Sequence, residues 1–528
     1  MPVATMEGTG RAEDANQSRH GRLVRWKRDG CMIGKLMTLQ MPFDNTYARL
    51  PERFFARLAP TQVRSPRLVR VNAPLAAQLG LDPEWLAGEA GVAFLAGNHV
   101  AAGSEPIATA YAGHQFGNFV PQLGDGRAIL LGELVDQGGQ RRDLQLKGAG
   151  RTPFSRGGDG RAALGPVLRE YVVSEAMAAL GIPTTRALAA VVTGEGVRRE
   201  ELLPGAILAR VAASHIRVGT FQFFASRGDV GGLRVLADYA IARHYPDAAH
   251  AEQPYRALLD GVIRTQASLI AGWMLLGFIH GVMNTDNMAI TGESIDYGPC
   301  AFLDDYDPQA FFSAIDQHGR YAYFRQPSIG LWNLARLAEC LLPLLADDPD
   351  AAVVVAQEAL DAYAPWFEQT YQAMLRRKLG LVTELADDAA LGRDLLEAMR
   401  ANSADFTLTF RRLSAVPSGD EDDDGMRRLF ADPSAYDNWA ARWRQRLAQE
   451  PTDAATRRSA MLAVNPAFIP RNHRVEAVIR AAIDHDDFAP LDELVTVLSK
   501  PFDDQPVYAQ YAEPPAEHER VRQTFCGT

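Results

Sequence analysis

The sequence predicts an α+β fold in which a strand-rich lobe comes before a larger helical lobe. Residues 124–148 have the pattern of a β-hairpin, with apolar segments on both sides of a turn that contains two glycines. From residue 238 onward, apolar side chains recur at helical spacing over long segments. Hydrophobic residues make up 47% of the 528 residues, which is enough for a large core and excludes disorder for most of the chain.

The elements are expected in this order along the chain. Residues 43–113 indicate short helices, and the hairpin strands follow at 128–131 and 144–147. A helix is expected from Ala162 to Leu180, because apolar residues recur at helical spacing and Pro183 lies just beyond its end. Later strands and helices are expected at 187–192, 206–211, 239–244, 255–279, 331–345 and 352–379. An acidic exposed loop at 418–425 comes before further helices, which run to about residue 498.

These patterns divide the chain into five parts. The first is a polar tail at 1–36, interpreted as disordered or as sequence upstream of a start at Met37. The others are an N-terminal extension at 37–120, the strand-rich lobe at 121–235, the helical lobe at 236–400, and a C-terminal helical extension with its tail at 401–528.

Charge and cysteine content exclude several classes of protein. Lys plus Arg is 54 and Asp plus Glu is 65, so the net charge of −11 argues against a nucleic-acid binder. Four cysteines in a chain of this length exclude a disulfide scaffold, and the absence of a CxxC pair argues against structural zinc. No apolar run reaches the ~20 residues of a membrane span, and residues 269–282 are interpreted as a buried helix. We expect a cytoplasmic monomer that binds neither nucleic acid nor membrane.

The strongest motif runs from His280 to Asn287 and is followed by Asp296-Tyr-Gly. Protein kinases have H-R-D-x-x-x-x-N and then D-F-G, in which the first Asp accepts a proton and the Asn and second Asp hold metal. Val282 stands where the kinase base would be, so conventional base catalysis is lost. Asp286 is the nearest carboxylate and could serve as a displaced base. A polar turn after a helix is the alternative interpretation of this segment.

Upstream residues follow the kinase order as well. Gly124-Asp-Gly-Arg127 precedes the hairpin, Lys147 ends it, and Glu170 lies on the next helix, as in the Lys–Glu pair of kinases. Arginines gather in the same lobe, and the guanidinium group matches the geometry of a phosphate, which favours a polyphosphate ligand. A solvated basic face is the alternative interpretation of these arginines. They are Arg151, Arg156, Arg161, Arg210 and Arg217. His114 could be a catalytic or capping residue, and a structural histidine in a Gly-rich turn is the interpretation we favour. HExxH, GxSxG and Walker A motifs are absent.

Together these motifs resemble the selenoprotein O family of bacteria and mitochondria. The residues that carry the resemblance lie at 111–117, 122–127, 146–150, 159–162, 181–186, 280–287 and 296–299. The resemblance implies a protein-kinase-like bilobal fold with N- and C-terminal extensions, a pseudokinase by motif. It implies transfer of AMP from ATP, bound in a flipped orientation, to Ser, Thr or Tyr hydroxyls of proteins, with release of pyrophosphate.

The same resemblance assigns roles to residues of this chain. The implied nucleotide-binding residues are Gly124, Gly126, Arg127, Lys147, Asp159, Gly160, Arg210, Arg217 and Asp296. Glu170 would pair with Lys147, Asp286 would accept the proton, and Asn287 and Asp296 would hold Mg²⁺ or Mn²⁺. Alternatives are UMP transfer from UTP with Mn²⁺, γ-phosphoryl transfer (against which Val282 argues), and a catalytically dead scaffold. A scaffold would not need the metal ligands.

The family also has a Cys or selenocysteine almost at the C-terminus, where this chain has Cys526. In some members it forms a disulfide with a Cys after the Asp-x-Gly motif, but the matching position here is Phe312. Cys300 is an alternative partner by its place next to that motif. A free buried Cys300 is the other interpretation.

Overall fold

The computed structural model describes residues 41–416 and 423–525. The described residues belong to one compact unit. They form a mixed α/β fold with an antiparallel sheet, as the sequence predicts at the level of fold class. The expected tail at 1–36, Cys31, Cys526 and most of the acidic loop lie outside the described residues.

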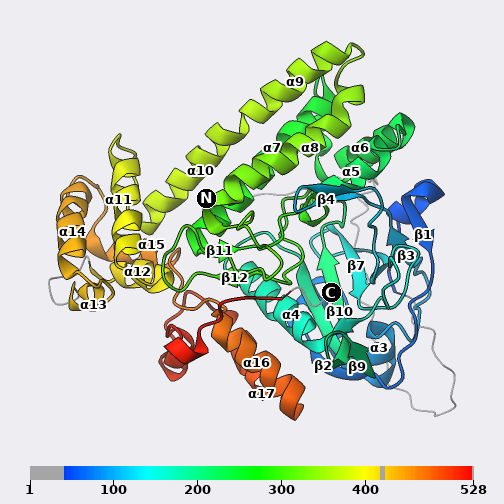
Figure 1. Ribbon diagram of the computed structural model, residues 1–528, viewed down its shortest axis with the longest axis horizontal. Helices are drawn as coiled ribbons and strands as arrows, with labels where there is room; N and C mark the ends of the chain where they lie inside the picture. The colour runs from blue at the N-terminus through cyan, green and yellow to red at the C-terminus, as the bar shows by residue number, and fades with distance from the viewer. Residues whose placement is uncertain (1–40, 417–422, 526–528) are drawn as a thin grey trace, which may run out of the picture. The chain divides into compact units, whose positions relative to one another are not determined.

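The main sheet has the strand order β1-β3-β6-β7-β10-β9-β2, with β8 paired to β10 (Figure 1). Its strands are β1 (Phe55–Arg57), β2 (Arg67–Val71), β3 (Ile107–Thr109), β6 (Ala128–Val135), β7 (Arg141–Lys147), β8 (Ala162–Ala163), β9 (Arg186–Arg198) and β10 (Leu202–Ala212). The predicted hairpin is therefore confirmed as β6 and β7, with Ala128 opposite Lys147. Residues from the expected extension at 37–120 supply β1, β2 and β3.

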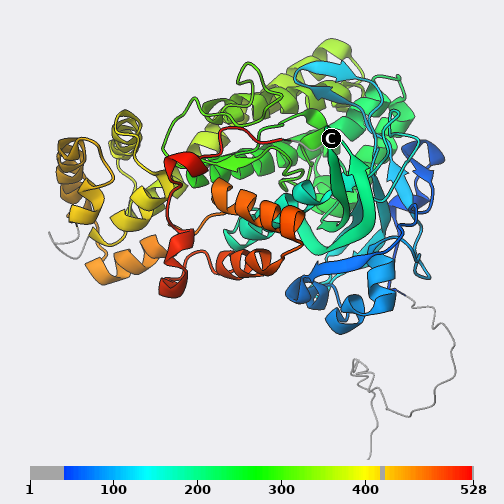
Figure 2. The ribbon, with the colours of Figure 1, turned by 60° about the horizontal axis from the view of Figure 1, so that its bottom comes forward.

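Two small strand pairs lie apart from this sheet: β4 (Gly113–Gln115) with β5 (Asn118–Val120), and β11 (Phe278–Ile279) with β12 (Ala301–Phe302). The helices that flank the sheet are α1 (Ala73–Gln78), α2 (Pro83–Ala87), α3 (Glu89–Leu95) and α4 (Leu164–Ala179). Helix α4 packs on β9 and β10, and α16 (Asn472–His485) and α17 (Ala489–Leu498) pack on α4, as Figure 2 shows. The chain's C-terminal helices thus cover the helix that carries Glu170.

The remaining helices form the helical part of the unit. They are α5 (Val218–Ala225), α6 (Val230–His244), α7 (Pro254–Leu276), α8 (Gln326–Leu345), α9 (Pro349–Asp361), α10 (Tyr363–Lys378), α11 (Asp388–Ala401), α12 (Phe406–Leu413), α13 (Asp423–Arg427), α14 (Pro433–Leu447) and α15 (Ala454–Leu462). Buried side chains of α7 contribute to two large hydrophobic clusters, and α8 and α10 pack against it. Helix α7 is therefore central to the core that supports the loop at 280–287.

Several predicted boundaries were wrong for identifiable reasons. Helix α7 stops at Leu276 because Gly277 adopts a left-handed conformation with φ of 70° and caps the helix. The helix predicted at 352–379 is two helices, since Pro365 cannot donate to the carbonyl of Asp361 and its ring clashes there. Helix α6 begins earlier than predicted, at Val230, where the side chain of Asp229 accepts a hydrogen bond from Gly232 N.

The predicted exposed loop at 418–425 also needs correction where it is described. Asp423 is buried and begins α13. Its carboxylate accepts a hydrogen bond of 3.1 Å from the Tyr436 hydroxyl and contacts the Arg444 guanidinium. These two partners explain why an aspartate from an acidic run is taken into the interior.

One described segment, Tyr323–Leu345, is long and apolar enough to cross a membrane by length and composition, which the sequence analysis did not predict. It includes α8, and half of its tested window is buried inside the protein. Leu334, Leu337 and Leu341 belong to one of the hydrophobic clusters shared with α7. These contacts are those of a core helix.

Candidate functional site

Three elements of the fold bring together the predicted Lys147, Glu170 and Arg210. Lys147 ends β7, Glu170 lies in the middle of α4, and Arg210 lies on β10 next to β7. Lys147 Nζ contacts Glu170 Oε2, and Arg210 Nη1 donates to Glu170 Oε1 at 3.1 Å. Burial opposes ionisation of Glu170, but the charges of Lys147 and Arg210 hold its pKa below the ordinary value. Glu170 is thus an ionised carboxylate held between two cations.

Asp296 is joined to this cluster from the segment that follows the loop at 280–287. Its Oδ1 lies 3.1 Å from Lys147 Nζ. Its φ of 68° is left-handed, which is uncommon for a residue other than glycine and often marks functional sites. Burial opposes its ionisation, yet Lys147, Arg127 and Arg210 hold its pKa well below the usual range. The structure therefore places an anionic carboxylate beside three predicted phosphate-binding cations.

Asp286 and Asn287 lie in a short 3-10 turn at Thr285–Asn287. The Asp286 carboxylate is buried; Gln115 Nε2 donates to Oδ2 at 3.2 Å, while Oδ1 has no hydrogen-bond partner among the described residues. Burial raises the pKa of Asp286 to about 6, against the opposing effect of Arg217. Arg217 Nη1 donates to the Asp286 backbone carbonyl at 2.9 Å. A carboxyl group with this pKa can accept a proton near neutral pH.

The Gly113–Val120 hairpin covers Asp286, which the sequence analysis did not foresee. A Cβ on Gly113 would lie 2.7 Å from Asp286 Oδ1. His114 N donates to Thr285 Oγ1 at 2.7 Å, and the His114 ring nitrogen Nδ1 lies 2.7 Å from Gln222 Nε2. His114 thus helps to hold the hairpin, as a structural histidine would. The motif at 111–117 was the only sequence signal for these contacts.

His280 and Val282 are both buried in the loop. The His280 ring nitrogen Nε2 lies 2.9 Å from the carbonyl oxygen of Ile295, the residue before Asp296. Val282 accepts at its backbone oxygen a hydrogen bond of 3.1 Å from Asn287 Nδ2. His280 therefore ties the loop to the Asp296 segment, and Val282 orients Asn287 through its main chain.

The glycine-rich segments pack on each other. Gly124 has φ of 69°, and a Cβ there would lie 2.3 Å from the Phe154 ring; a Cβ on Gly126 would lie 2.8 Å from Phe154 O. A Cβ on Gly160 would lie 2.1 Å from the carbonyl oxygen of Gly150. These glycines are needed for loop packing, a reason that sequence reasoning missed. Gly148 N donates to Arg127 O at 2.7 Å. This hydrogen bond joins the loop before β6 to the loop that follows Lys147.

Asp159 lies at the more exposed side of the second loop. Its carboxylate pairs with Arg199 at 2.9 Å and accepts a hydrogen bond from Arg161 N at 2.9 Å. Its side chain is 45% exposed. Asp159 is thus held by Arg199 and Arg161, which lie next to it, and not by the residues around Lys147.

The described residues contain no group of three His, Cys, Asp or Glu side chains arranged to hold a metal ion. Asn287 and Asp296 offer two oxygen donors, an amide and an ionised carboxylate. Mg²⁺ prefers oxygen ligands and commonly takes only one or two from protein, with the rest from phosphate and water. This donor set fits such an ion.

Cys300 is a free, buried cysteine, and burial raises the pKa of its thiol to about 12. Its Sγ lies 3.2 Å from Tyr297 O. Thr524 N donates to Phe312 O at 2.7 Å, and Thr524 Oγ1 donates to Pro299 O at 2.7 Å. The segment before Cys526 therefore lies beside both segments considered for a disulfide, although Cys526 itself is outside the described residues.

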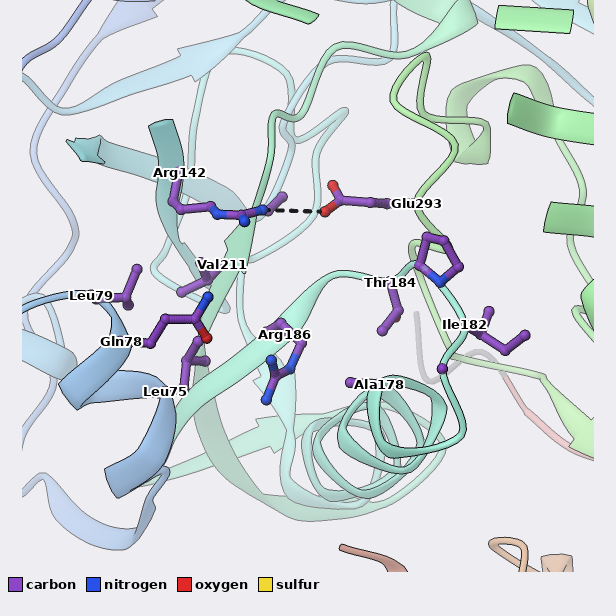
Figure 3. Close-up of a pocket in the computed structure, with 13 residues that line it drawn as sticks. Leu75, Gln78, Leu79, Arg142, Ala178, Ile182, Thr184, Arg186, Val211 and Glu293 are labelled. Carbon is purple, nitrogen blue, oxygen red and sulfur yellow. Dashed lines mark ion pairs between the residues drawn. The ribbon is translucent and has the colours of Figure 1, made fainter. Parts of the chain in front are cut away.

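A cavity of about 330 Å³ lies between α1, α4 and β7, and Figure 3 draws the residues that line it. Arg142 and Glu293 face each other across it, 3.9 Å apart, and burial raises the pKa of Glu293 to about 7. None of the predicted nucleotide-binding residues lines this cavity. It is separate from the cluster around Lys147.

Comparison with known proteins shows the family to which the chain is similar. A family model described as protein adenylyltransferase SelO matches residues 37–499. A protein named protein nucleotidyltransferase YdiU from Rhodopseudomonas palustris (strain BisB5) is 64% identical over 492 residues, which is 93% of this chain and 100% of the relative. Proteins of the same name from Methylorubrum populi and Bradyrhizobium sp. are 65% identical over 498 and 492 residues, with the same coverage.

Proposed function

Because this chain belongs to the protein adenylyltransferase SelO family and is a protein nucleotidyltransferase, we propose that it transfers AMP from ATP to protein hydroxyls. The acceptors are Ser, Thr or Tyr side chains of other proteins, and pyrophosphate is released. The observation that carries this proposal is the cluster in which Lys147 contacts both Glu170 and Asp296. Arg217, another predicted phosphate-binding residue, donates to the Asp286 carbonyl at 2.9 Å. The proposed proton acceptor is thus hydrogen-bonded through its main chain to one of the proposed phosphate-binding side chains.

We also propose a kinase-like arrangement for the unit. The strand-rich lobe at 121–235 would supply the nucleotide-binding loops, and the helical lobe at 236–400 would supply the loop with Asp286 and Asn287. The order β6, β7 with Lys147, and α4 with Glu170 supports this assignment. The protein would act in the cytoplasm as a monomer, without nucleic acid or membrane.

The chemical roles follow from charge and position. Arg127, Lys147, Arg210 and Arg217 would bind the polyphosphate, and the loops with Gly124, Gly126, Asp159 and Gly160 would enclose the nucleotide. Glu170 holds Lys147 and Arg210 in place. Asn287 and Asp296 would hold Mg²⁺ or Mn²⁺, which neutralises charge on the phosphates when bound.

Asp286 would act as general base. The acceptor hydroxyl oxygen forms a bond to the α-phosphorus, and the bond from that phosphorus to the oxygen bridging it to the β-phosphorus breaks. The hydroxyl proton moves to Asp286, and the electron pair of the broken bond leaves with pyrophosphate. The pKa of about 6 leaves Asp286 mainly ionised at neutral pH, yet basic enough to accept a proton.

The test is a paired label-transfer assay with ATP labelled at the α- or the γ-phosphate, with Mg²⁺ and then with Mn²⁺. Label on protein only from the α position is expected. Label only from the γ position would make the protein a kinase and would refute the argument from Val282. No label from either position, with ATP bound, would favour the dead scaffold.

Two variants test the assignment of residues. Asp296→Ala should abolish transfer by removing a metal ligand. Full activity in this variant would refute the assignment of the site. Asp286→Ala should impair transfer more than ATP binding, and equal loss of both would show that Asp286 is not the base. Replacing labelled ATP by α-labelled UTP with Mn²⁺ distinguishes UMP transfer, the alternative.

A further inference from the structure

Asp125 lies between the two glycines of the Gly124–Gly126 segment and has no role in the proposed function so far. It is 1% exposed. Its Oδ2 accepts hydrogen bonds from Thr109 N at 3.0 Å, from Thr109 Oγ1 at 2.6 Å and from Gln145 Nε2 at 3.2 Å. Three donors on one oxygen fix the carboxylate in a single orientation.

The second carboxylate oxygen of Asp125 is directed toward a cation. Oδ1 has no hydrogen-bond partner among the described residues and lies 3.6 Å from Arg217 Nη2. Arg217 is itself buried, and its guanidinium lies 4.4 Å from the Tyr111 ring centroid. A buried carboxylate and a buried guanidinium this close attract strongly, because little water screens them. Asp125 thus contacts Arg217 at Nη2, while Nη1 donates to Asp286 O.

Gln145 extends the same contacts to the second arginine. It lies two residues before Lys147 on β7 and therefore on the same face of the strand. Its Nε2 donates to Asp125, and its Oε1 accepts from Arg210 Nη2. One fully buried amide therefore connects Asp125 with Arg210, which in turn contacts Glu170.

We propose that Asp125, assisted by Gln145, is a positioning residue that holds Arg217 and Arg210 in the orientation in which they bind the nucleotide polyphosphate. The contacts form a continuous chain from Glu170 to Arg217, with no exposed member. Arginines held in this way are organised before the ligand arrives, which reduces the cost of binding. The inference rests on the proposed nucleotide site and adds a residue that does not touch the nucleotide.

The experiment compares ATP affinity in a double-mutant cycle of the full-length protein, with variants Asp125→Asn, Arg217→Gln and both together. Asp125→Asn keeps the size of the side chain and removes its charge. Losing a charge-assisted contact is worth about a tenfold change in affinity. ATP affinity should therefore fall about tenfold in the wild-type background and only about threefold in the Arg217→Gln background, where the contact with Arg210 through Gln145 remains. KM for ATP should rise in parallel while kcat changes little.

Two results would overturn the proposal. An equal loss in both backgrounds would show that Asp125 acts independently of Arg217, and an unchanged affinity would show that it positions nothing. If wild-type protein transfers no α-label, the proposed function fails instead, so the two failures are distinguishable. Asp388→Asn is the matched control, because Asp388 is a buried carboxylate paired with Arg446 far along the chain. It should leave ATP affinity unchanged.

A milder variant keeps the test decisive if Asp125→Asn does not fold. Thr109→Val removes one of the three donors to Asp125 Oδ2 and leaves the charge in place. It should weaken ATP binding about threefold in the wild-type background, as expected for loss of one hydrogen bond, and by a smaller factor with Arg217→Gln. The same loss in both backgrounds would count against the proposal.

Discussion

Lys147 Nζ lies 3.1 Å from Asp296 Oδ1 while it also contacts Glu170 Oε2. One ammonium group thus joins strand β7, helix α4 and the segment after the loop at 280–287. Each carboxylate holds Lys147 from a different element, so its position depends on the sheet and on the helical part together. This shared cation is the basis of the first prediction.

Glu170→Gln should reduce nucleotide transfer at least tenfold. The substitution leaves Arg210 without its buried counter-charge and leaves Lys147 with Asp296 alone, and breaking such a buried pair costs about 3–5 kcal/mol of stability. We expect a lower Tm and a weaker affinity for ATP, measured by thermal unfolding and calorimetry.

Glu175→Gln is the control for Glu170→Gln, since Glu175 lies on the same helix and pairs with Arg186 instead. It should lower Tm but leave transfer by the folded protein within twofold. If Glu175→Gln and Glu170→Gln lowered transfer equally, the effect would be one of helix stability alone.

Gly113→Ala should lower kcat by displacing Asp286. The new Cβ would lie 2.7 Å from Asp286 Oδ1 and 3.0 Å from Leu123 Cδ1, so the hairpin or the carboxylate must move. Misplacing the base by about 1 Å can reduce the rate about 10²-fold, while binding of ATP should persist. Single-turnover transfer and ATP affinity measure the two effects separately.

Gly231→Ala provides the comparison for Gly113→Ala. A Cβ there would have its nearest contact at 3.6 Å, an ordinary van der Waals distance, in the first turn of α6. Transfer should be unchanged, and the free energy of unfolding should rise slightly, because alanine favours helix over glycine by about 1 kcal/mol. Wild-type kcat in Gly113→Ala would show that the hairpin does not constrain Asp286.

Removal of divalent metal should abolish transfer, and Asn287→Ala should raise the Mg²⁺ concentration needed for half-maximal activity about tenfold. The Asn287 side chain is oriented by its hydrogen bond to Val282 O, so its oxygen is a prepared ligand. A titration of transfer rate against Mg²⁺ measures this shift. The same half-maximal Mg²⁺ concentration in the variant and the wild type would exclude Asn287 as a ligand.

Lys378→Met should stabilise the protein, and the gain should depend on pH. Burial lowers the pKa of Lys378 from 10.5 to about 7, with the Phe410 ring centroid 4.5 Å from Nζ. Between these values the unfolded chain binds a proton that the folded chain does not, so stability falls as pH decreases. The Tm advantage of the variant should grow from pH 10 to pH 7 and then level off.

Thermal unfolding at several pH values checks this, with Arg377→Met as the control. Arg377 is exposed and adjacent in sequence, and an arginine stays charged across this range. Its Tm difference from wild type should not vary with pH. A Tm difference for Lys378→Met that is equally independent of pH would show that Lys378 titrates normally.

The sequence by itself predicted the residues of the candidate site and determined the elements that carry them. The hairpin, α4 and the loop at 280–287 follow from local periodicity and from motif order, because both depend on neighbours along the chain. For this reason Lys147, Glu170 and Asp296 could be named before their contacts were known. Breaks between helices were harder to predict from periodicity. Pro365 ends α9, yet the apolar periodicity continues across it.

Only the tertiary structure decided which side chains meet across distant segments. The hairpin at 113–120 covers Asp286, and Gln145 connects Asp125 with Arg210, although no local pattern distinguishes these residues from others on a strand or turn. The same holds for Lys378, whose lowered pKa follows from burial by α12 and other distant elements. Periodicity reports how a segment folds on itself, whereas burial and charge pairing depend on what the rest of the chain places beside it.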